Sequence, residues 1–219
     1  MRTVIDDPFS PDPGFAELYG DLPDATDLWP WLELAQAAAA PVLYLGIGAG
    51  RLAVPLHTAG VTLVGVDSHP GMLARLRRRL PELRTVQSPI ERLALEERFR
   101  LIMAPSNILY LVQRLRAAAS HLDPAGVLAL ELANPHWLRA GAGDGVRVRQ
   151  MDGNQARLEI DYRLPDRGII TQRAEVTLVW PEEMENWLQL GAGLKLQRMF
   201  GRRDEQLATS PSFYVVAGR

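Results

Sequence analysis

Three glycines and one aspartate have the types and the spacing to do chemistry in this chain. The run VLYLGIGAG places Gly46, Gly48 and Gly50 directly after a buried, strand-like segment, and a second apolar segment ends in Asp67, 21 residues after Gly46. Glycines let backbone N–H groups approach a ligand without interference from a Cβ atom. A carboxylate at the end of the second strand accepts hydrogen bonds from ribose hydroxyls. The pattern therefore indicates a nucleoside-cofactor site.

Two kinds of cofactor are bound by this arrangement. A nicotinamide dinucleotide usually requires G-x-G-x-x-G, with its pyrophosphate on the helix N-terminus. Here the spacing is G-x-G-x-G, and the next residue is Arg51. This segment resembles motif I of the class I S-adenosylmethionine-dependent methyltransferases, a strand followed by LGxGxGR. Other segments resemble that family in the same order: GVDSHPGML, FRLIMAPSNILYLV, PEEMENWLQLGAGLKLQRMFG and the closing strand SFYVVAG.

The resemblance implies that S-adenosyl-L-methionine is the cofactor and places its contacts on particular residues. The contacts of the glycine turn are mainly through the backbone, so Ile47 and Ala49 are mild departures from the Cys and Thr common in the family. Ser68 and Met72 align with positions that border the adenine. Ala104 ends the segment that borders the methionine moiety and the reaction site.

One position departs from the family pattern more strongly. Many members carry an aspartate after the third strand that accepts from the adenine amino group, and this chain aligns Pro89 there. We expect Ser88 or the backbone of Ile90 to make the contact instead. The missing acid also supports a rival hypothesis, a catalytically silent methyltransferase-like protein that binds a partner or only the nucleoside. An NAD-binding oxidoreductase is the third hypothesis.

Two residues are candidates for a general base. In-line methyl transfer to a small molecule needs an acceptor held against the methyl group, and a hydroxyl or ammonium acceptor must also lose a proton. Tyr19 lies in an N-terminal segment of the kind that covers the pocket in small-molecule methyltransferases, with packing against Phe15 as the alternative. His136 follows the fifth strand at the ligand-binding edge of such sheets, with a surface-loop histidine as the alternative. The predicted acceptor atom is nitrogen or oxygen.

The elements that must position these residues alternate between strands and helices, which predicts an α/β fold with a parallel sheet and right-handed crossovers. With the resemblance, the expectation is a Rossmann-like doubly wound sheet of seven strands, the last one antiparallel. The predicted strands are 42–46, 61–66, 83–86, 99–104, 126–133, 194–200 and 212–218, and the predicted helices are 50–59, 71–80, 108–121 and 181–191.

An antiparallel β insertion is expected before the last two strands. Residues 146–179 contain three pieces that alternate apolar and charged residues, separated by turn residues. Leu158, Ile160 and Tyr162 would supply one apolar face, and we expect this segment to cover the carboxyl edge of the sheet. The domain prediction is a helical cap over 1–40, a cofactor-binding domain over 41–139 and 180–219, and a substrate lid over 140–179.

The N-terminal region is predicted to close the site. The Pro- and Asp-rich start suggests a loose arm, and Asp27 is expected to cap a helix that carries Pro30 in its first turn and ends before Pro41. The segment 13–34 carries enough apolar side chains to require burial. We expect it to fold over the cofactor, with Tyr19 reaching toward the reacting end.

Composition excludes several other functions. The 219 residues carry a net charge of −2 and no cysteine, and no run approaches the ~20 apolar residues of a membrane helix. The four histidines lack metal-site spacing, so no metal is predicted. The arginines at 75 and 77–79 are predicted to form a solvated helix face, with a phosphate or RNA patch as the alternative. The expectation is a cytoplasmic protein with a small-molecule substrate and no nucleic-acid or membrane partner; a homodimer stays open.

Overall fold

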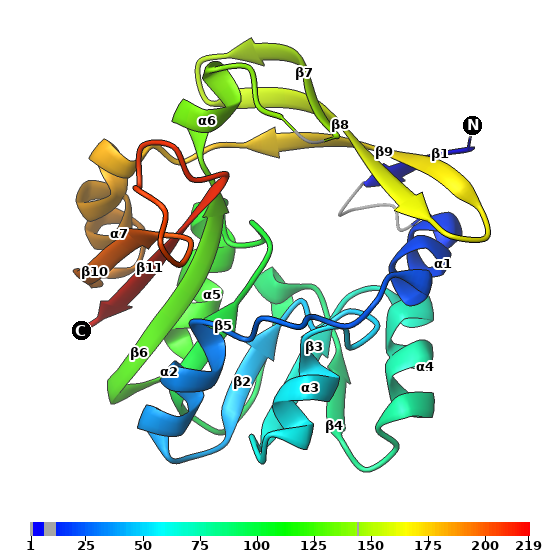
Figure 1. Cartoon of the computed structure of the whole chain (residues 1–219). Helices are drawn as coiled ribbons and strands as arrows, with labels where there is room; N and C mark the ends of the chain where they lie inside the picture. Colours follow the sequence, from blue (N-terminus) through cyan, green and yellow to red (C-terminus); the bar gives the residue numbers. More distant parts are fainter. Residues whose placement is uncertain (1, 7–11, 144) are drawn as a thin grey trace.

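A seven-stranded sheet with helices on both faces forms the larger layer of the molecule (Figure 1). The computed structural model describes residues 2–6, 12–143 and 145–219. The strand order is β10-β11-β6-β5-β2-β3-β4, and β11 runs antiparallel to both its neighbours while the other pairs are parallel. The predicted α/β fold class is therefore confirmed. The strands are β2 (Val42–Leu45), β3 (Leu63–Asp67), β4 (Arg84–Gln87), β5 (Phe99–Ala104), β6 (Leu122–Ala133), β10 (Lys195–Gly201) and β11 (Ser212–Gly218).

The helices divide between the two faces of this sheet. One apolar cluster joins the sheet to α2, α3 and α4, and the other joins it to α5 and α7. Two short helices, η1 and α6, lie in connections after β4 and β6. The helices are α1 (Pro13–Asp21), α2 (Trp31–Ala38), α3 (Ala53–Thr58), α4 (Pro70–Arg79), η1 (Ile90–Arg92), α5 (Val112–Ser120), α6 (Pro135–Arg139), η2 (Pro181–Glu183) and α7 (Met184–Ala192).

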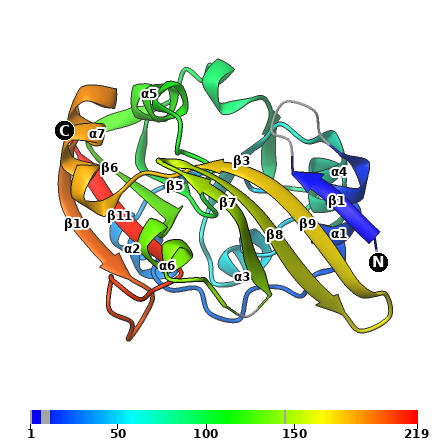
Figure 2. The same cartoon turned by 90° about the horizontal axis from the view of Figure 1, so that it is seen from above.

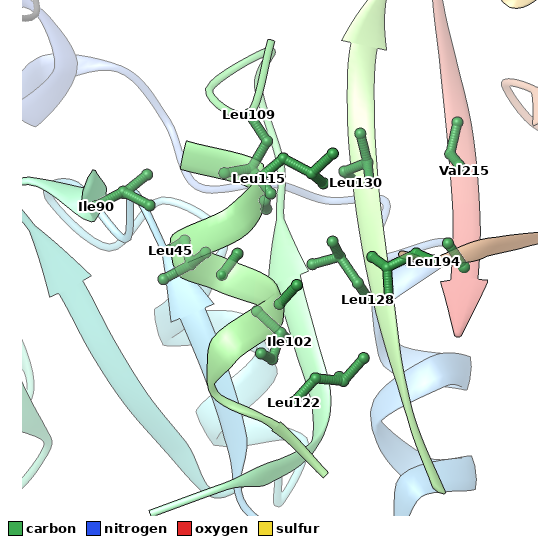
Figure 3. Packing of buried hydrophobic residues seen from close by; sticks show 14 of the residues in the cluster. Leu45, Ile90, Ile102, Leu109, Leu115, Leu122, Leu128, Leu130, Leu194 and Val215 are labelled. Atoms are coloured by element: carbon green, nitrogen blue, oxygen red, sulfur yellow. The ribbon is translucent and has the colours of Figure 1, made fainter. Parts of the chain in front are cut away.

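The centre of the sheet is buried on both faces. Leu45 of β2, Ile102 of β5 and Leu128 of β6 have no exposed surface, and they pack in one cluster with Leu115 of α5 (Figure 3). Strands covered on both sides read as nearly continuous apolar runs, which is why these segments were predictable. They give the loops at their carboxyl ends a rigid base.

A second sheet lies above the carboxyl ends of β2 and β3 (Figures 1 and 2). Its order is β1-β9-β8-β7, with antiparallel hairpins between β7, β8 and β9. The three strands predicted within residues 146–179 are all present, and their position over this edge is the predicted one. The strands are β1 (Arg2–Asp6), β7 (Val146–Asp152), β8 (Gln155–Leu164) and β9 (Gly168–Thr177).

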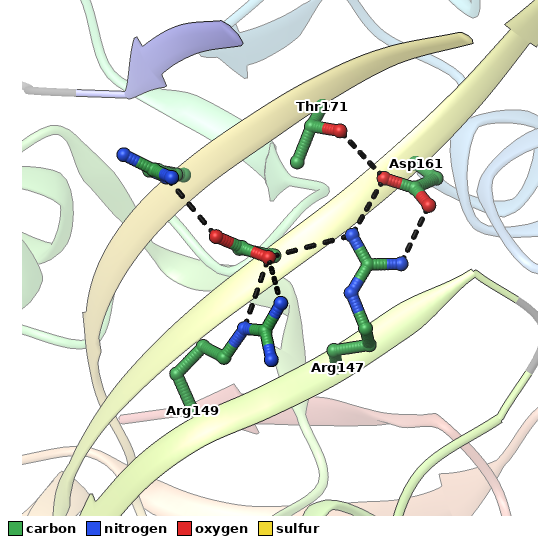
Figure 4. Close-up of polar contacts among 6 residues, drawn as sticks. Arg147, Arg149, Asp161 and Thr171 are labelled. Atoms are coloured by element: carbon green, nitrogen blue, oxygen red, sulfur yellow. Dashed lines mark hydrogen bonds and ion pairs between the residues drawn. The ribbon is translucent and has the colours of Figure 1, made fainter. Parts of the chain in front are cut away.

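The two faces of this second sheet differ in chemistry. On the apolar face, Leu158 and Ile160 pack near α6, and Tyr162 packs against α1. The opposite face carries ion pairs: Asp161 accepts from both terminal nitrogens of Arg147, at 2.5 and 2.8 Å (Figure 4). The apolar face thus supplies the contacts to α1 and α6.

Three expectations about the N-terminal half and the loops are wrong. The start of the chain is not simply a loose arm, because residues 2–6 form β1 and pair in parallel with β9; residues 7–11 lie outside the described part. Asp27 does not cap α2, since its Oδ1 accepts from Trp29 N and the helix begins only after Pro30. The helix predicted from residue 108 begins at Val112.

Only part of the segment 13–34 folds as expected. α1 lies beside α4 and under β1 and β9, at the carboxyl edge of the larger sheet (Figure 1). α2 instead packs on the flat face of the sheet, where Trp31 and Trp29 meet the edge of Tyr214. The second half of the segment therefore contributes to the core and not to a cover.

Candidate active site

Backbone hydrogen bonds join the glycine turn to Asp67. Gly46 and Gly48 follow β2 with φ of 67° and 60°, a left-handed conformation that favours glycine. Asp67 Oδ2 accepts from Gly48 N at 2.8 Å, and Oδ1 accepts from His69 N at 2.8 Å. Burial raises the pKa of Asp67 above its ordinary value, and the two N–H groups oppose this shift by stabilising the carboxylate. The carboxylate is thus fixed at the junction of β2 and β3.

A cavity of about 220 Å³ opens beside this junction. It lies at the carboxyl ends of the strands, because its walls include residues from the loops that follow β2, β3, β4 and β5. Such edges are where open α/β sheets bind ligands. The residues predicted from the sequence that line it are Tyr19, Gly46, Gly48, Asp67, Ser68, Met72, Ser88 and Ile90.

Three predicted site residues are not among the described residues that line the cavity. Gly50 has a φ of 93°, and a Cβ there would lie 2.7 Å from Leu76 Cδ1, so its role is close packing against α4. Ala104 is fully buried at the end of β5. His136 lies in α6, where its Nε2 is 2.6 Å from Glu182 Oε1.

Tyr19 lines the side of the cavity formed by α1, which we call the roof, and two polar side chains of the second sheet bond to it from behind. Tyr19 of α1 lies with its hydroxyl 3.1 Å from that of Tyr162. Tyr162 donates to Gln172 Oε1 at 2.9 Å, and Gln172 is only 3% exposed. From the sequence, Tyr162 was expected on an apolar face, and Gln172 was not among the predicted site residues. A polar residue at a core-facing position of a strand is the signal that could have found it.

His69 connects α1 to the loop that follows Asp67, on the side of the cavity that we call its floor, which comprises the glycine turn and Asp67. Its Nδ1 accepts from Gly71 N at 3.1 Å, so a neutral ring carries its proton on Nε2. That nitrogen lies 3.1 Å from the carbonyl oxygen of Asp12, to which it donates. The start of α1 is therefore bonded to the loop that follows Asp67, and both His69 and Asp12 line the cavity.

The loop after β5 forms another wall in a conformation that non-glycine residues rarely adopt. Ser106 and Asn107 have φ of 70° and 52°. Glu131 Oε2 accepts from Ser106 N at 3.1 Å, and Asn107 Oδ1 accepts from Ala133 N at 3.0 Å. These bonds to β6 hold a strained loop in place, which is common at functional sites.

The residues present fit S-adenosylmethionine. A Cβ built on Gly48 meets only the Gly46 carbonyl oxygen, at 3.9 Å, so the space in front of the turn is open for a ligand. Each Asp67 oxygen accepts one backbone bond and has a lone pair left for a ribose hydroxyl. Met72, which is 3% exposed, provides an apolar surface suited to a base.

Sequence comparisons point to the same chemistry. Residues 42–126 match the family model described as a methyltransferase domain. Over 99 residues, covering 43% of this chain, the sequence is 31% identical to trans-aconitate 2-methyltransferase of Escherichia coli O139:H28 (strain E24377A / ETEC). The matched region spans 39% of that relative's length. None of the helices in the described part of the chain has the length and apolar character needed to cross a membrane.

Solved structures share the whole fold. The CcbJ methyltransferase from Streptomyces caelestis superposes with a TM-score of 0.73 at 23% identity, covering 93% of this chain and 95% of that one. The SAM-bound amino pentose methyltransferase CalS10 from Micromonospora echinaspora gives a TM-score of 0.64 at 22% identity, covering 94% and 91%. The domain match over residues 42–126, the shared fold and the fitting cavity make the chain similar to S-adenosylmethionine-dependent methyltransferases.

Proposed function

We propose that this chain transfers the methyl group of S-adenosylmethionine to a nitrogen or oxygen atom of a small molecule. The observation that carries the proposal is one cavity that joins the glycine turn, Asp67 and Tyr19. A nucleoside-binding floor and a hydroxyl-bearing roof therefore face the same space. When bound, the cofactor supplies an electrophilic methyl group on a sulfonium that leaves without help from a protein nucleophile.

The chain's own residues would bind and orient the reactants and exclude water from them. Asp67 accepts hydrogen bonds from ribose, and Gly48 leaves room for the methionine part. The Tyr19 hydroxyl, held by Tyr162 and Gln172, accepts a hydrogen bond from an N–H or O–H of the acceptor and so directs its lone pair. Positioning of this kind, with water excluded by α1 and β9, is the main source of rate for methyl transfer.

The names of similar proteins support a small acceptor. Trans-aconitate and an amino pentose are the acceptors named for two of them, and both are small molecules. The roof formed by α1 and the second sheet limits what can enter the cavity from above. We assign no role to His136, which is paired with Glu182 outside the cavity.

A two-stage experiment tests the proposal against its rivals. Thermal unfolding with S-adenosylhomocysteine, NAD or NADP comes first, since a ligand at 100 times its dissociation constant adds ~2.7 kcal/mol of stability. We expect a shift with S-adenosylhomocysteine alone. Incubation with methyl-labelled S-adenosylmethionine and panels of amines, alcohols and carboxylic acids follows. Binding without labelling of any acceptor would favour the silent binding protein, and a shift only with NAD or NADP would contradict the proposal.

A further inference from the structure

One wall of the cavity carries a buried cation with no role in the proposed function so far. Arg114 lies in the first turn of α5, is 8% exposed, and lines the cavity together with Ser88, Pro89 and Ile90. A buried charge is costly unless it has partners. An arginine is charged at any pH of interest and offers five donors and no acceptor.

The partners of Arg114 use only part of its donor capacity. Nε donates to Glu91 Oε2 at 3.3 Å, and Nη1 donates to the Ile108 carbonyl oxygen at 3.2 Å. No residue in the described part of the chain accepts a hydrogen bond from Nη2. Since no buried side-chain nitrogen or oxygen there lacks a partner, Nη2 must be reached from solvent. Arg114 lines the cavity, and Nη2 is the guanidinium nitrogen that is available to a ligand there.

The carboxylate nearest this wall, Glu91, is paired with Arg114 and is not among the described residues that line the cavity. Asp12 and Asp67 are the acidic residues among the described lining, and Asp67 belongs to the glycine turn at the other end. The Asp12 oxygens accept from Gly14 N at 2.8 Å and Ile5 N at 3.2 Å. Ser88 Oγ already donates to the Pro89 carbonyl oxygen at 2.9 Å. Arg114 therefore makes this wall a hydrogen-bond donor.

We propose that Arg114 binds the purine of the cofactor by donating to an acceptor atom on the edge of the ring. This inference rests on the proposed function, which places ribose at Asp67 and the base beyond it toward residues 88–90. Adenine offers ring nitrogens as acceptors, and a 6-oxopurine offers O6 as well, the edge that arginine prefers. A carboxylate at this wall would instead select the amino group of adenine and reject O6. Arg114 thus makes the site tolerant of a 6-oxopurine.

Calorimetric titration of two nucleosides tests this selectivity. The ligands are S-adenosyl-L-homocysteine and its deaminated analogue S-inosyl-L-homocysteine, which has O6 in place of the amino group. For the unmodified chain, we expect the deaminated ligand to bind within about threefold of S-adenosylhomocysteine, or more tightly. Arg114→Met should weaken both by roughly 10- to 100-fold, the value of a hydrogen bond from a charged donor. Arg116→Met makes the same change on the exposed face of the same helix and should change neither.

A second variant covers the risk that Arg114→Met leaves Glu91 unpaired and unfolds the chain. The double variant Glu91→Gln, Arg114→Met removes both charges and so leaves no unpaired, partly buried carboxylate. It should fold, by circular dichroism, and show the same loss of affinity for both ligands.

Each other outcome has a defined meaning. If S-adenosylhomocysteine binds the unmodified chain but the deaminated ligand is more than 100-fold weaker, the Arg114 proposal is wrong and the proposed function stands. The same holds if the folded Arg114 variants keep their affinity for S-adenosylhomocysteine. If neither ligand binds the unmodified chain, the proposed function fails and the Arg114 proposal fails with it.

Discussion

The floor and the roof of the cavity are built by different means. The floor, which comprises the glycine turn and Asp67, is set by backbone geometry on strands with no exposed surface at their centre. The roof, which comprises α1 and the second sheet behind it, depends on side chains from separate parts of the chain: Tyr19 lines the cavity, and Tyr162 and Gln172 bond to it from behind. The floor should therefore fix cofactor affinity, while the roof should fix the acceptor and the access of water.

Two elements of the roof are joined to each other by a partly exposed ion pair. Asp21 of α1 pairs with Arg167 of the β8–β9 turn at 2.9 Å, but both side chains are partly exposed. Exposed ion pairs of this kind contribute ~0–1 kcal/mol. Elements held by few buried contacts open most readily and are the ones that serve as lids. The roof is thus the part expected to respond to ligand.

The largest effect is expected at Asp67. Asp67→Ala should weaken S-adenosylhomocysteine binding by about 100-fold or more, because two charge-assisted hydrogen bonds to ribose are lost. Asp123→Ala is the matched control, since Asp123, at the start of β6 and outside the cavity lining, also accepts a backbone N–H, from Ala125. Calorimetry on both folded variants is the measurement. Near-native affinity in Asp67→Ala would show that Asp67 does not bind the cofactor.

The next effect comes from filling the space in front of the glycine turn. Gly48→Val should weaken S-adenosylhomocysteine binding by at least ~10-fold, because the side chain enters the cavity and strains a residue at φ 60°. Gly60→Val imposes similar strain at φ 88° in open space. We expect both variants to lose stability but only Gly48→Val to lose affinity. Equal loss of affinity in both would show that strain alone is responsible.

A smaller effect on binding, with a clear effect on turnover, is expected in the roof. Tyr19→Phe and Tyr162→Phe should each lower methyl transfer by about 10-fold or more, by analogy with other positioned proton-handling groups. S-adenosylhomocysteine affinity should stay within about threefold. Tyr214→Phe removes a hydroxyl from the aromatic cluster on the sheet face and serves as control. Unchanged turnover in both roof variants would show that the Tyr19 hydroxyl has no part in methyl transfer and that Tyr19 only packs.

The smallest effect is a pH dependence of opposite sign in the two regions. Arg147 lowers the pKa of Asp161 from 3.8 to about 2, so this pair stabilises the fold above pH 3.8 and the contribution is lost as the pH falls toward 2. Burial raises the pKa of Asp67, so its contribution to stability decreases as the pH rises from 3.8 through the raised value. We expect the free energy of unfolding, measured with urea between pH 2 and 6, to fall less at low pH in Asp161→Asn than in the unmodified chain. A steeper fall of the free energy of unfolding at low pH in that variant would contradict a stabilising ion pair between Arg147 and Asp161.

The sequence predicted the floor far better than the roof, for a physical reason. Glycines at a sharp turn and an acid at a strand end act through local backbone geometry, which spacing alone reveals. In the roof, Tyr19 was selected, but its partners Tyr162 and Gln172 lie 143 and 153 residues away, and only the fold brings them together.

Other differences have similar causes. The pairing of β1 with β9 joins two segments that are far apart in the sequence, and nothing local in residues 2–6 indicates it. Gly50 follows the motif spacing but serves packing against Leu76. No local pattern singles out Arg114, because burial beside a cavity is a property of the fold.

Hydrogen exchange with and without S-adenosylhomocysteine tests the central claim, that a rigid floor and a closing roof bind one cofactor between them. We expect added protection in two places on ligand binding, the glycine turn through Met72 and the roof at α1, residues 13–21. The core strand β6 serves as the internal reference and should not change. Protection confined to residues 44–72, with unchanged exchange across α1, would show that the roof is ordinary packing and takes no part in the site.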